Sequence, residues 1–191
     1  MPNNILFDWL GPFYDHIFGS KDTGIFDQPL ALPAEGWMLD LGGGTGRSSA
    51  GLADKVDRLV LCDLSMPMLQ KAGDKGLHHR VQASATDLPF AEGTFNRILV
   101  VDALHHMPEQ RTTTGEMVRT LKPGGRLLIE EPDIRLFAVK LIALMEKVLL
   151  MKSYFHTPDE IKDMAESFGT QAVVDTDGRG SAWIMVDKPG S

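Results

Sequence analysis

Short apolar runs alternate with longer amphipathic segments from Trp37 onward, and this alternation limits the fold more than any other feature of the sequence. Five of these runs have the length of a strand, and each is followed by a turn or a helix-opening signal. They are Trp37–Leu41, Arg58–Cys62, His79–Gln82, Arg97–Val101 and Arg126–Glu130. Strands that alternate with helices pair in parallel, since each helix carries the chain back to the same edge of the sheet. The sequence therefore predicts a doubly wound α/β core.

Serine, threonine and proline residues mark where the first helices begin. Ser and Pro suit the first helical turn, whose N–H groups have no partner within the helix. Helix starts are predicted near Thr45, near Ser65 with Pro67 behind it, and near Pro108. The last of these helices is expected to end at Lys122-Pro123-Gly124-Gly125.

The C-terminal part of the chain predicts two more helices and a hairpin. Ile134–Met151 has the length and pattern of a long helix, and Thr157-Pro158-Asp159-Glu160 has the spacing of a capping box. Gln171–Asp175 and Ala182–Val186 are strand-like runs joined through a glycine-containing turn. The hairpin would add an antiparallel pair, which makes a seven-stranded, mostly parallel sheet the expected fold.

Composition restricts the partners and the location. The length fits one domain over residues 1–191, with 43% hydrophobic and 24% charged residues, as in ordinary globular proteins. A net charge of -7 has the wrong sign for binding phosphate backbones, so no nucleic-acid partner is expected. Cys62 is the only cysteine and no signal segment opens the chain, which favours the cytoplasm. Four charged residues interrupt Ile134–Met151, so no stable membrane insertion is expected.

A glycine-rich turn follows the first predicted strand and indicates a ligand loop. The loop begins after Asp40 and contains Gly42, Gly43, Gly44 and Gly46. Glycines let the backbone turn tightly and approach a ligand, although a plain glycine-rich connector is the alternative. The G-x-G-x-x-G spacing of dinucleotide dehydrogenases is not completed in either frame. A carboxylate before the first glycine would repel a pyrophosphate and attract an ammonium, which favours a zwitterionic cofactor without phosphate.

Two further acidic residues follow the next predicted strands. Asp63 ends the second strand about twenty residues after the glycine loop, where a carboxylate can accept hydrogen bonds from both ribose hydroxyls. Its alternative role is a helix cap or a solvated acid. Asp87 lies in Thr86-Asp87-Leu88-Pro89-Phe90, where it could accept from an adenine amino group while Leu88 packs against the ring.

Together these motifs resemble those of the class I S-adenosylmethionine-dependent methyltransferases over most of the chain, from about Phe13 onward. The quoted segments are Asp-Leu-Gly-Gly-Gly-Thr-Gly from Asp40, Asp63, Thr86–Phe90 and Leu121–Leu127. Within the class the chain is similar to the ubiquinone/menaquinone C-methyltransferase group, through Phe13-Tyr14-Asp15 and Asp63-Leu64-Ser65-x-x-Met68-Leu69. One departure is Asn96, where that group usually has Asp.

The resemblance implies a Rossmann-like sheet that binds S-adenosylmethionine and releases S-adenosylhomocysteine. By this resemblance the glycine loop and Asp40 hold the methionyl part, Leu64 and Met68 flank the adenine, and Val101 adds backbone contacts. Tyr14 would cover the cofactor, with a packed aromatic as the alternative. The expected chemistry is in-line methyl transfer, in which the protein orients donor and acceptor and excludes water. A general base is needed only when the acceptor carries a proton.

His106 is the first candidate for such a base, because it follows the fourth strand, where the carboxyl ends of parallel strands face the ligand crevice. The alternative is that His106 only packs beneath the cofactor or bonds to a loop. A metal site built from Asp102, His105, His106 and Glu131 is a further, disfavoured alternative, since the Asp-Asn pair expected from the metal-dependent catechol methyltransferases is missing.

The methyl acceptor is expected to be a small apolar or aromatic molecule. The N-terminal segment, residues 1–33, would cap the site, and a Met- and Leu-rich lid or substrate helix over residues 134–153 would shape the acceptor pocket or touch a membrane surface. Tyr154 and His156 are further candidates for that pocket. A monomer or a homodimer fits the sequence equally well. The competing function is a non-catalytic adaptor or sensor that binds the cofactor.

Overall fold

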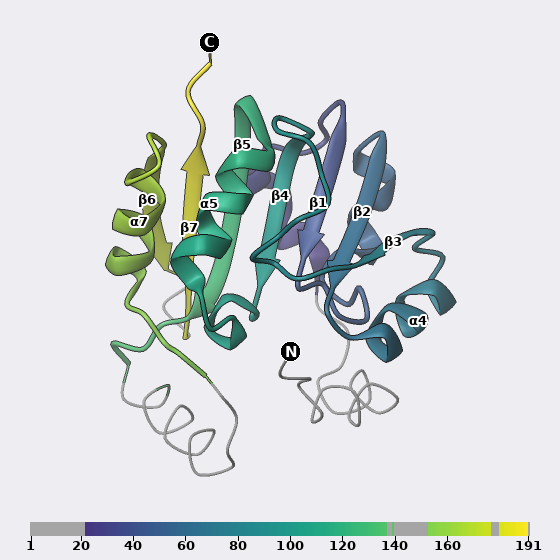
Figure 1. Cartoon of the computed structure of the whole chain (residues 1–191), viewed down its shortest axis with the longest axis horizontal. Coiled ribbons are helices and arrows are strands. Elements are labelled where there is room, and N and C mark those ends of the chain that lie inside the picture. Colours follow the sequence, from purple (N-terminus) through teal and green to yellow (C-terminus); the bar gives the residue numbers. More distant parts are fainter. Residues whose placement is uncertain (1–21, 137–138, 140–152, 177–179, 191) are drawn as a thin grey trace.

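A seven-stranded sheet with the order β3-β2-β1-β4-β5-β7-β6 forms the centre of the computed structural model, which describes residues 22–136, 139, 153–176 and 180–190 (Figure 1). The parallel strands are β1 Trp37–Leu41, β2 Arg58–Asp63, β3 His79–Gln82, β4 Phe95–Val101 and β5 Leu121–Pro132. Strands β6 Gln171–Thr176 and β7 Ser181–Asp187 pair in antiparallel fashion with each other, and β7 also pairs with β5. The predicted fold class, with its closing hairpin, is confirmed.

The strand order places the first-strand loop at a switch in the direction of the sheet. The chain runs from β1 outward to β2 and β3, then returns to β4 on the other side of β1. In such sheets the loops that follow β1 and β4 diverge and leave a crevice at the carboxyl ends of the strands. This edge is the lower one in Figure 1.

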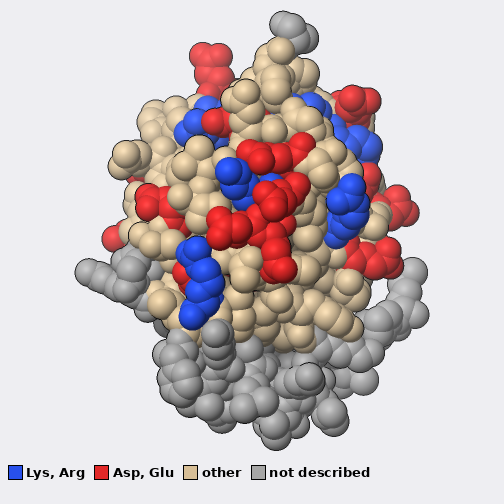
Figure 2. Space-filling model, turned by 90° about the vertical axis from the view of Figure 1, so that its left-hand side faces the viewer, with Lys and Arg blue, Asp and Glu red and all other residues tan. Residues whose placement is uncertain are grey.

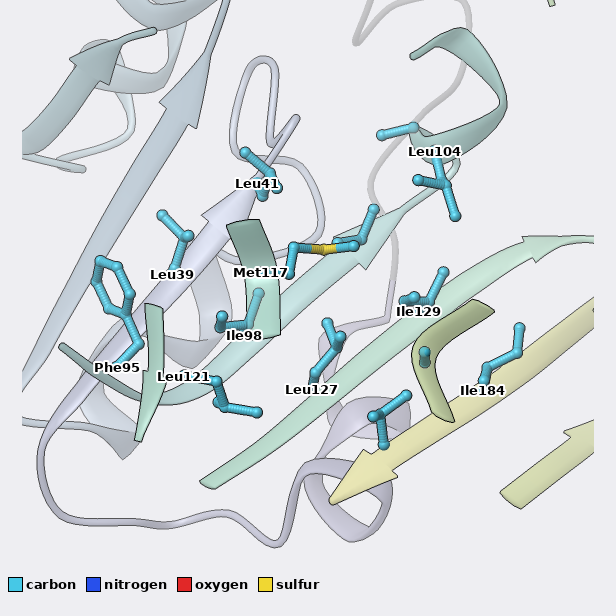
Figure 3. Packing of buried hydrophobic residues seen from close by; sticks show 14 of the residues in the cluster. Leu39, Leu41, Phe95, Ile98, Leu104, Met117, Leu121, Leu127, Ile129 and Ile184 are labelled. Atoms are coloured by element: carbon cyan, nitrogen blue, oxygen red, sulfur yellow. The ribbon is translucent and has the colours of Figure 1, made fainter. Parts of the chain in front are cut away.

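Both faces of the sheet are covered by helices, which explains why its strands are nearly continuous apolar runs. Helices α5 Gln110–Thr120 and α7 Pro158–Glu166 cover one face, where Met117 and Ile161 pack among strand residues. Figure 3 shows Met117 over Leu39, Ile98 and Leu127 in this layer. The other face is covered by α3 Asp27–Leu30, the short helices η2 Thr23–Phe26 and η3 Ala50–Lys55, and α4 Met66–Asp74.

The cap signals that the sequence contains are used as predicted in two helices. Ser65 caps α4 by accepting from the N–H of Met68, with a proline in the first turn. Thr157 and Glu160 form a complete capping box at α7. Helix α5 begins at Gln110, close to the predicted start at Pro108.

Two predictions about local structure are wrong. The helix expected from Thr45 is a series of turns followed by η3, because Gly46 has a φ of 72° and the Ser49 side chain bonds to Asp40 rather than to the helix start. The strand expected from Arg126 begins at Leu121, directly after α5, with a register shift between the partners of Phe95 and Arg97. The predicted helix Ile134–Met151 lies mostly outside the described residues.

Acidic side chains gather on the side of the molecule that carries α7 and β6 (Figure 2). Two of the few basic residues there are paired, Arg135 with Asp159 and Lys162 with Glu166. In the part of the chain that the structure describes, no helix is both long and apolar enough to cross a bilayer.

Candidate functional site

A small hollow opens at the carboxyl edge of the sheet between the glycine loop and the end of β4. The loop glycines 42–44 line it together with Asp40 from β1, Arg47, and Val101 from β4. Two N–H groups, of Gly42 and Gly43, donate to the carbonyl of Cys62 at 2.8 and 3.4 Å and tie the loop to β2. The hollow therefore brings together five of the predicted residues, Asp40, Gly42, Gly43, Gly44 and Val101, whereas Gly46 is not among its lining residues.

The loop requires glycine for two reasons, a positive φ at some positions and a lack of space for a side chain at others. Gly42 and Gly44 have positive φ values of 71° and 54°, which side-chain-bearing residues rarely adopt. At Gly43 an added Cβ would lie 2.3 Å from Oδ2 of Asp40. At Gly44 it would meet only Asp63 Oδ2, at 3.9 Å. The backbone at Gly44 therefore faces open space, as a backbone that cradles a ligand must.

Asp40 lies beneath the loop rather than on its surface. Its side chain is buried, and Ser49 Oγ donates a hydrogen bond of 2.5 Å to Oδ2. Burial raises the pKa of Asp40 from 3.8 to about 7, the charge of Asp63 adds to the rise, and the Ser49 bond opposes it. A cation in the hollow would favour the ionised form of this carboxyl group.

Asp63 joins the glycine loop to the start of α4. Its Oδ2 accepts from the N–H of Gly44 at 2.8 Å, and its Oδ1 accepts from the N–H of Ser65 at 2.8 Å. Asp63, the last residue of β2, thus contacts both the ligand loop and the start of α4, and its ribose role stays a prediction.

The segment Thr86–Phe90 is fixed by side chains from α5 that sequence reasoning missed. Glu116 Oε2 accepts from the N–H of Leu88 at 2.9 Å, and Arg119 donates to the carbonyls of Leu88 at 3.1 Å and Phe90 at 2.8 Å. Glu116 and Arg119 also bond to each other, and this bond lowers the pKa of Glu116. The two residues lie about one helical turn apart, which was the only available signal of a pair.

The other residues predicted for the adenine side differ in exposure. Leu64 is 47% exposed and Asp87 is also exposed, so both are available to a ligand. Met68 and Leu88 are each 3% exposed, and Leu88 belongs to the main core cluster. A direct contact of the Leu88 side chain with an adenine ring would require this core to open. The backbone of Leu88, by contrast, lies in the segment that α5 fixes through hydrogen bonds.

A second buried carboxylate organises the loop after β4. Glu131, at the end of β5, accepts from the N–H groups of Ala103 and Leu104 through Oε1, and its Oε2 lies 2.5 Å from His105 Nδ1. The short helix η4 Leu104–His106 is held in place by these three contacts. The ring of Phe155 stacks on His105, and Tyr154 N–H donates to the His105 carbonyl at 2.7 Å.

His106 lies beside this cluster, with its Nδ1 3.3 Å from Ser153 Oγ. Burial, with a smaller effect from the neighbouring His105, lowers the pKa of His106 from 6.5 to about 3. The ring is therefore neutral at physiological pH. A neutral imidazole can accept a proton, but at such a low pKa it is a weak base.

Tyr154 and His156 line a second cavity of about 420 Å³ between α5 and α7, together with Gln110, Arg111 and Met164. They alternate along the chain with Ser153 and Phe155, which contact the histidines of η4. The segment 153–156 thus lies between this cavity and η4. The second cavity is separate from the hollow at the glycine loop, since they share no lining residue.

The metal-site alternative gains no support from the described residues. Among them, no group of three or more His, Cys, Asp or Glu side chains is placed to hold a metal ion. Glu131 and His105 engage each other, and Asp102 lies 3.6 Å from the guanidinium of Arg47. Tyr14 and most of the proposed cap and lid segments lie outside the described residues.

Comparison with known families identifies the central part of the chain. Residues 39–129, from β1 to β5, match a family described as a methyltransferase domain. The match includes the glycine loop, Asp63, the segment fixed by α5, and η4. The motifs used to predict the cofactor site therefore lie inside the family match.

Two curated proteins illustrate the similarity in sequence. A demethylmenaquinone methyltransferase of Paenarthrobacter aurescens is 41% identical over 135 residues, 66% of this chain and 53% of that protein. A ubiquinone/menaquinone biosynthesis C-methyltransferase of Haemophilus ducreyi is 38% identical over 104 residues, 49% of this chain and 40% of that protein. The matched part thus spans about half the length of these relatives, or less.

A solved structure extends the likeness of fold to nearly the whole chain. A SAM-dependent methyltransferase of Thermotoga maritima superposes with a TM-score of 0.73, covering 95% of this chain and 98% of that one. The two sequences are 20% identical, so this likeness concerns the fold.

Proposed function

We propose that the chain, whose residues 39–129 match a methyltransferase domain, is a class I S-adenosylmethionine-dependent methyltransferase that transfers a methyl group from S-adenosylmethionine to a small-molecule acceptor and releases S-adenosylhomocysteine. The observation that carries the proposal is the glycine loop, whose Gly44 backbone faces open space beside Asp63 while Asp40 lies beneath it. A pyrophosphate would meet two carboxylates there, whereas a sulfonium zwitterion brings a positive charge.

Different residues are assigned to different parts of the cofactor. Gly42, Gly43 and Gly44 let the backbone approach the methionyl part, and Val101 closes the hollow from β4. Gly46 is assigned to the same loop, where its positive φ sets the turn. Asp40 provides a negative charge for the ammonium once it is ionised. At the other end of the cofactor, Asp63 is assigned to the ribose hydroxyls.

The adenine lies, in this assignment, between α4 and the segment 86–90. Leu64 and Met68 flank it on the α4 side, and Asp87 and Leu88 approach it from the other side. Tyr14 is assigned as its cover. Because Leu88 is held in the core, we assign its ligand contact to the backbone.

S-adenosylmethionine supplies an activated methyl group with its own leaving group. The task of the protein is to align the acceptor with the methyl–sulfur bond and to exclude water. The η4 cluster borders the crevice on the β4 side, and Glu131 fixes the backbone there by accepting two N–H groups. A rigid wall of this kind limits the positions that an acceptor can take.

The acceptor class is a small apolar or aromatic molecule. Its support is the similarity to proteins named as quinone-biosynthesis methyltransferases, together with the largely buried His106 ring, whose lowered pKa keeps it neutral at physiological pH. His106 is the candidate proton acceptor. Since its pKa is about 3, it can serve only an acceptor that ionises readily, and an acceptor that is already ionised would need no base.

Incubation with methyl-labelled S-adenosylmethionine and a panel of quinols, phenols and amines tests this function. We expect S-adenosylhomocysteine to form above the acceptor-free level with at least one phenol or quinol, and the label to appear in that molecule by mass spectrometry. Tight cofactor binding with no transfer to any acceptor, including a total small-molecule extract, would favour the non-catalytic sensor or adaptor.

The remaining expectations stay predictions of the same proposal. They are a cytoplasmic location, a monomeric or homodimeric state, and the absence of nucleic-acid partners and stable membrane insertion. Sedimentation velocity measures the second of these directly. Flotation with liposomes tests whether the chain touches a membrane surface.

A further inference from the structure

We propose that Arg47 binds the carboxylate of the cofactor's amino-acid part and makes the site selective for adenosyl ligands that carry this group. The inference rests on the proposed function, and it adds a residue that neither the motif analysis nor the cofactor assignment above used. Arg47 follows directly after the last glycine of the loop.

The position of Arg47 is that of a ligand-contacting residue. It lines the hollow together with the loop glycines and Asp40, and it is the only basic residue among the described residues that do so. Its side chain is 16% exposed, so the guanidinium is largely removed from bulk water. A long, charged side chain normally keeps its charged group in water. A guanidinium that is largely buried, as this one is, requires a partner of opposite charge.

The ion pair that Arg47 makes with Asp102 is weak. Asp102 Oδ2 lies 3.6 Å from Arg47 Nη2, which is beyond the usual length of a hydrogen bond. Within the described residues, no hydrogen bond from the Arg47 guanidinium is found besides this ion pair. A guanidinium has five N–H donors in a planar fork that matches a carboxylate. Arg47 is therefore a mostly buried cation with donors to spare, at the wall of a hollow.

The charges around the hollow suit a zwitterion in one orientation. Asp40 lies under the glycine loop and would attract the ammonium group, while Arg47 would attract the carboxylate. Asp102 holds Arg47 from the β4 side, with its own N–H bonded to the carbonyl of Glu130 at 2.9 Å. Its φ of 50° is unusual for a residue other than glycine and fixes the direction in which it leaves β4.

A purely structural role is the competing explanation. Arg47 would then only join the glycine loop to β4 through Asp102. Such a role predicts that its loss weakens all adenosyl ligands alike, because the loop as a whole would loosen. A contact to the carboxylate predicts that its loss weakens only the ligands that have one.

The test compares S-adenosylmethionine with decarboxylated S-adenosylmethionine, which keeps the sulfonium and the amine, by calorimetric titration of the full chain. Hydrogen bonds to charged groups contribute about 1.5–3 kcal/mol, or roughly a 10- to 150-fold change in affinity. We expect the wild type to prefer the intact cofactor by at least about tenfold, and Arg47→Met to lose most of this preference.

Two further variants separate contact from general charge. Arg47→Lys keeps the charge without the planar fork, so we expect an intermediate preference. Arg58→Met removes a cation from the opposite edge of the sheet, where Arg58 lies 4.3 Å above the Trp37 ring, and should leave the preference unchanged. Thermal unfolding of each variant checks that it is folded.

The outcomes distinguish this inference from the proposed function. If the wild type binds neither ligand, the proposed function fails. If the wild type binds both and Arg47→Met keeps the wild-type ratio of affinities, Arg47 does not contact the carboxylate and the inference is overturned. A wild-type ratio in Arg47→Lys, combined with a lost preference in Arg47→Met, would support the contact to the carboxylate and overturn only the need for the planar guanidinium.

Discussion

Substitution of Gly43 by alanine tests the geometry of the ligand loop most sharply. The added methyl group would lie 2.3 Å from Asp40 Oδ2, 2.5 Å from Asp40 Cγ and 2.9 Å from Leu61 Cγ. Neither neighbour can retreat easily, since Asp40 and Leu61 are both buried. Overpacking of this kind costs about 1–3 kcal/mol, and displacement of the Ser49–Asp40 hydrogen bond adds about 1 kcal/mol. We therefore expect Gly43→Ala to lower the free energy of unfolding by about 2–4 kcal/mol.

The structure offers a matched control for this substitution. Gly190 has, like Gly43, no positive φ, and no atom lies within 4 Å of an added Cβ there, so Gly190→Ala adds a methyl group without a clash. We expect this control to leave the free energy of unfolding nearly unchanged. Urea unfolding followed by circular dichroism gives both values. If Gly43→Ala destabilises the protein no more than Gly190→Ala does, the close packing of the loop on Asp40 is refuted.

Three further outcomes follow from the charges at the site. Because the pKa of Asp40 is raised to about 7 in the folded state, its protonated form stabilises the fold below about pH 4, and this contribution is lost as the pH rises through 7. Urea unfolding from pH 4 to 8 should therefore show a smaller pH dependence of stability for Asp40→Asn than for the wild type. Asp63→Ala should weaken S-adenosylhomocysteine binding by at least about tenfold, whereas Asp74→Ala, on the exposed side of α4, should not; wild-type affinity in Asp63→Ala would show that the ribose assignment is wrong. Since the pKa of His106 is about 3, the pH profile of turnover should show no step between pH 5 and 8 that disappears in His106→Ala.

Much of the fold follows from local sequence patterns. The limits of β1 and β3 are those predicted, and β2, β6 and β7 differ from prediction by a residue at one or both ends. Hydrophobic runs and cap residues act over a few neighbours, so one sequence suffices to read them. The predicted resemblance to methyltransferases agrees with the family match over residues 39–129.

The errors arise where tertiary contacts override local signals. Residues after Gly46 read as a helix start, but Ser49 turns to Asp40 and the first turns are irregular. The chain at Leu121 reads as a helix end followed by a turn, but its pairing with Phe95 makes it the start of β5. In both places the partner lies in another element, which a local pattern cannot reveal.

The contacts at the site that the sequence did not predict share the same cause. Glu131 reaches His105 and the N–H groups of Ala103 and Leu104 across a separation of 26 to 28 residues. Arg47 and Asp102 meet only because β1 and β4 are adjacent in the sheet. A charged residue after a glycine loop carries no mark that tells a buried ligand contact from a solvated side chain.

Calorimetric titration of the purified chain with S-adenosylmethionine, S-adenosylhomocysteine and NAD in parallel tests the central claim most directly. The glycine loop over Asp40, with Asp63 bonded to the N–H of Gly44, predicts saturable binding of both adenosyl ligands and none of NAD. Binding of NAD, or of none of the three, would contradict the assignment of this loop to S-adenosylmethionine.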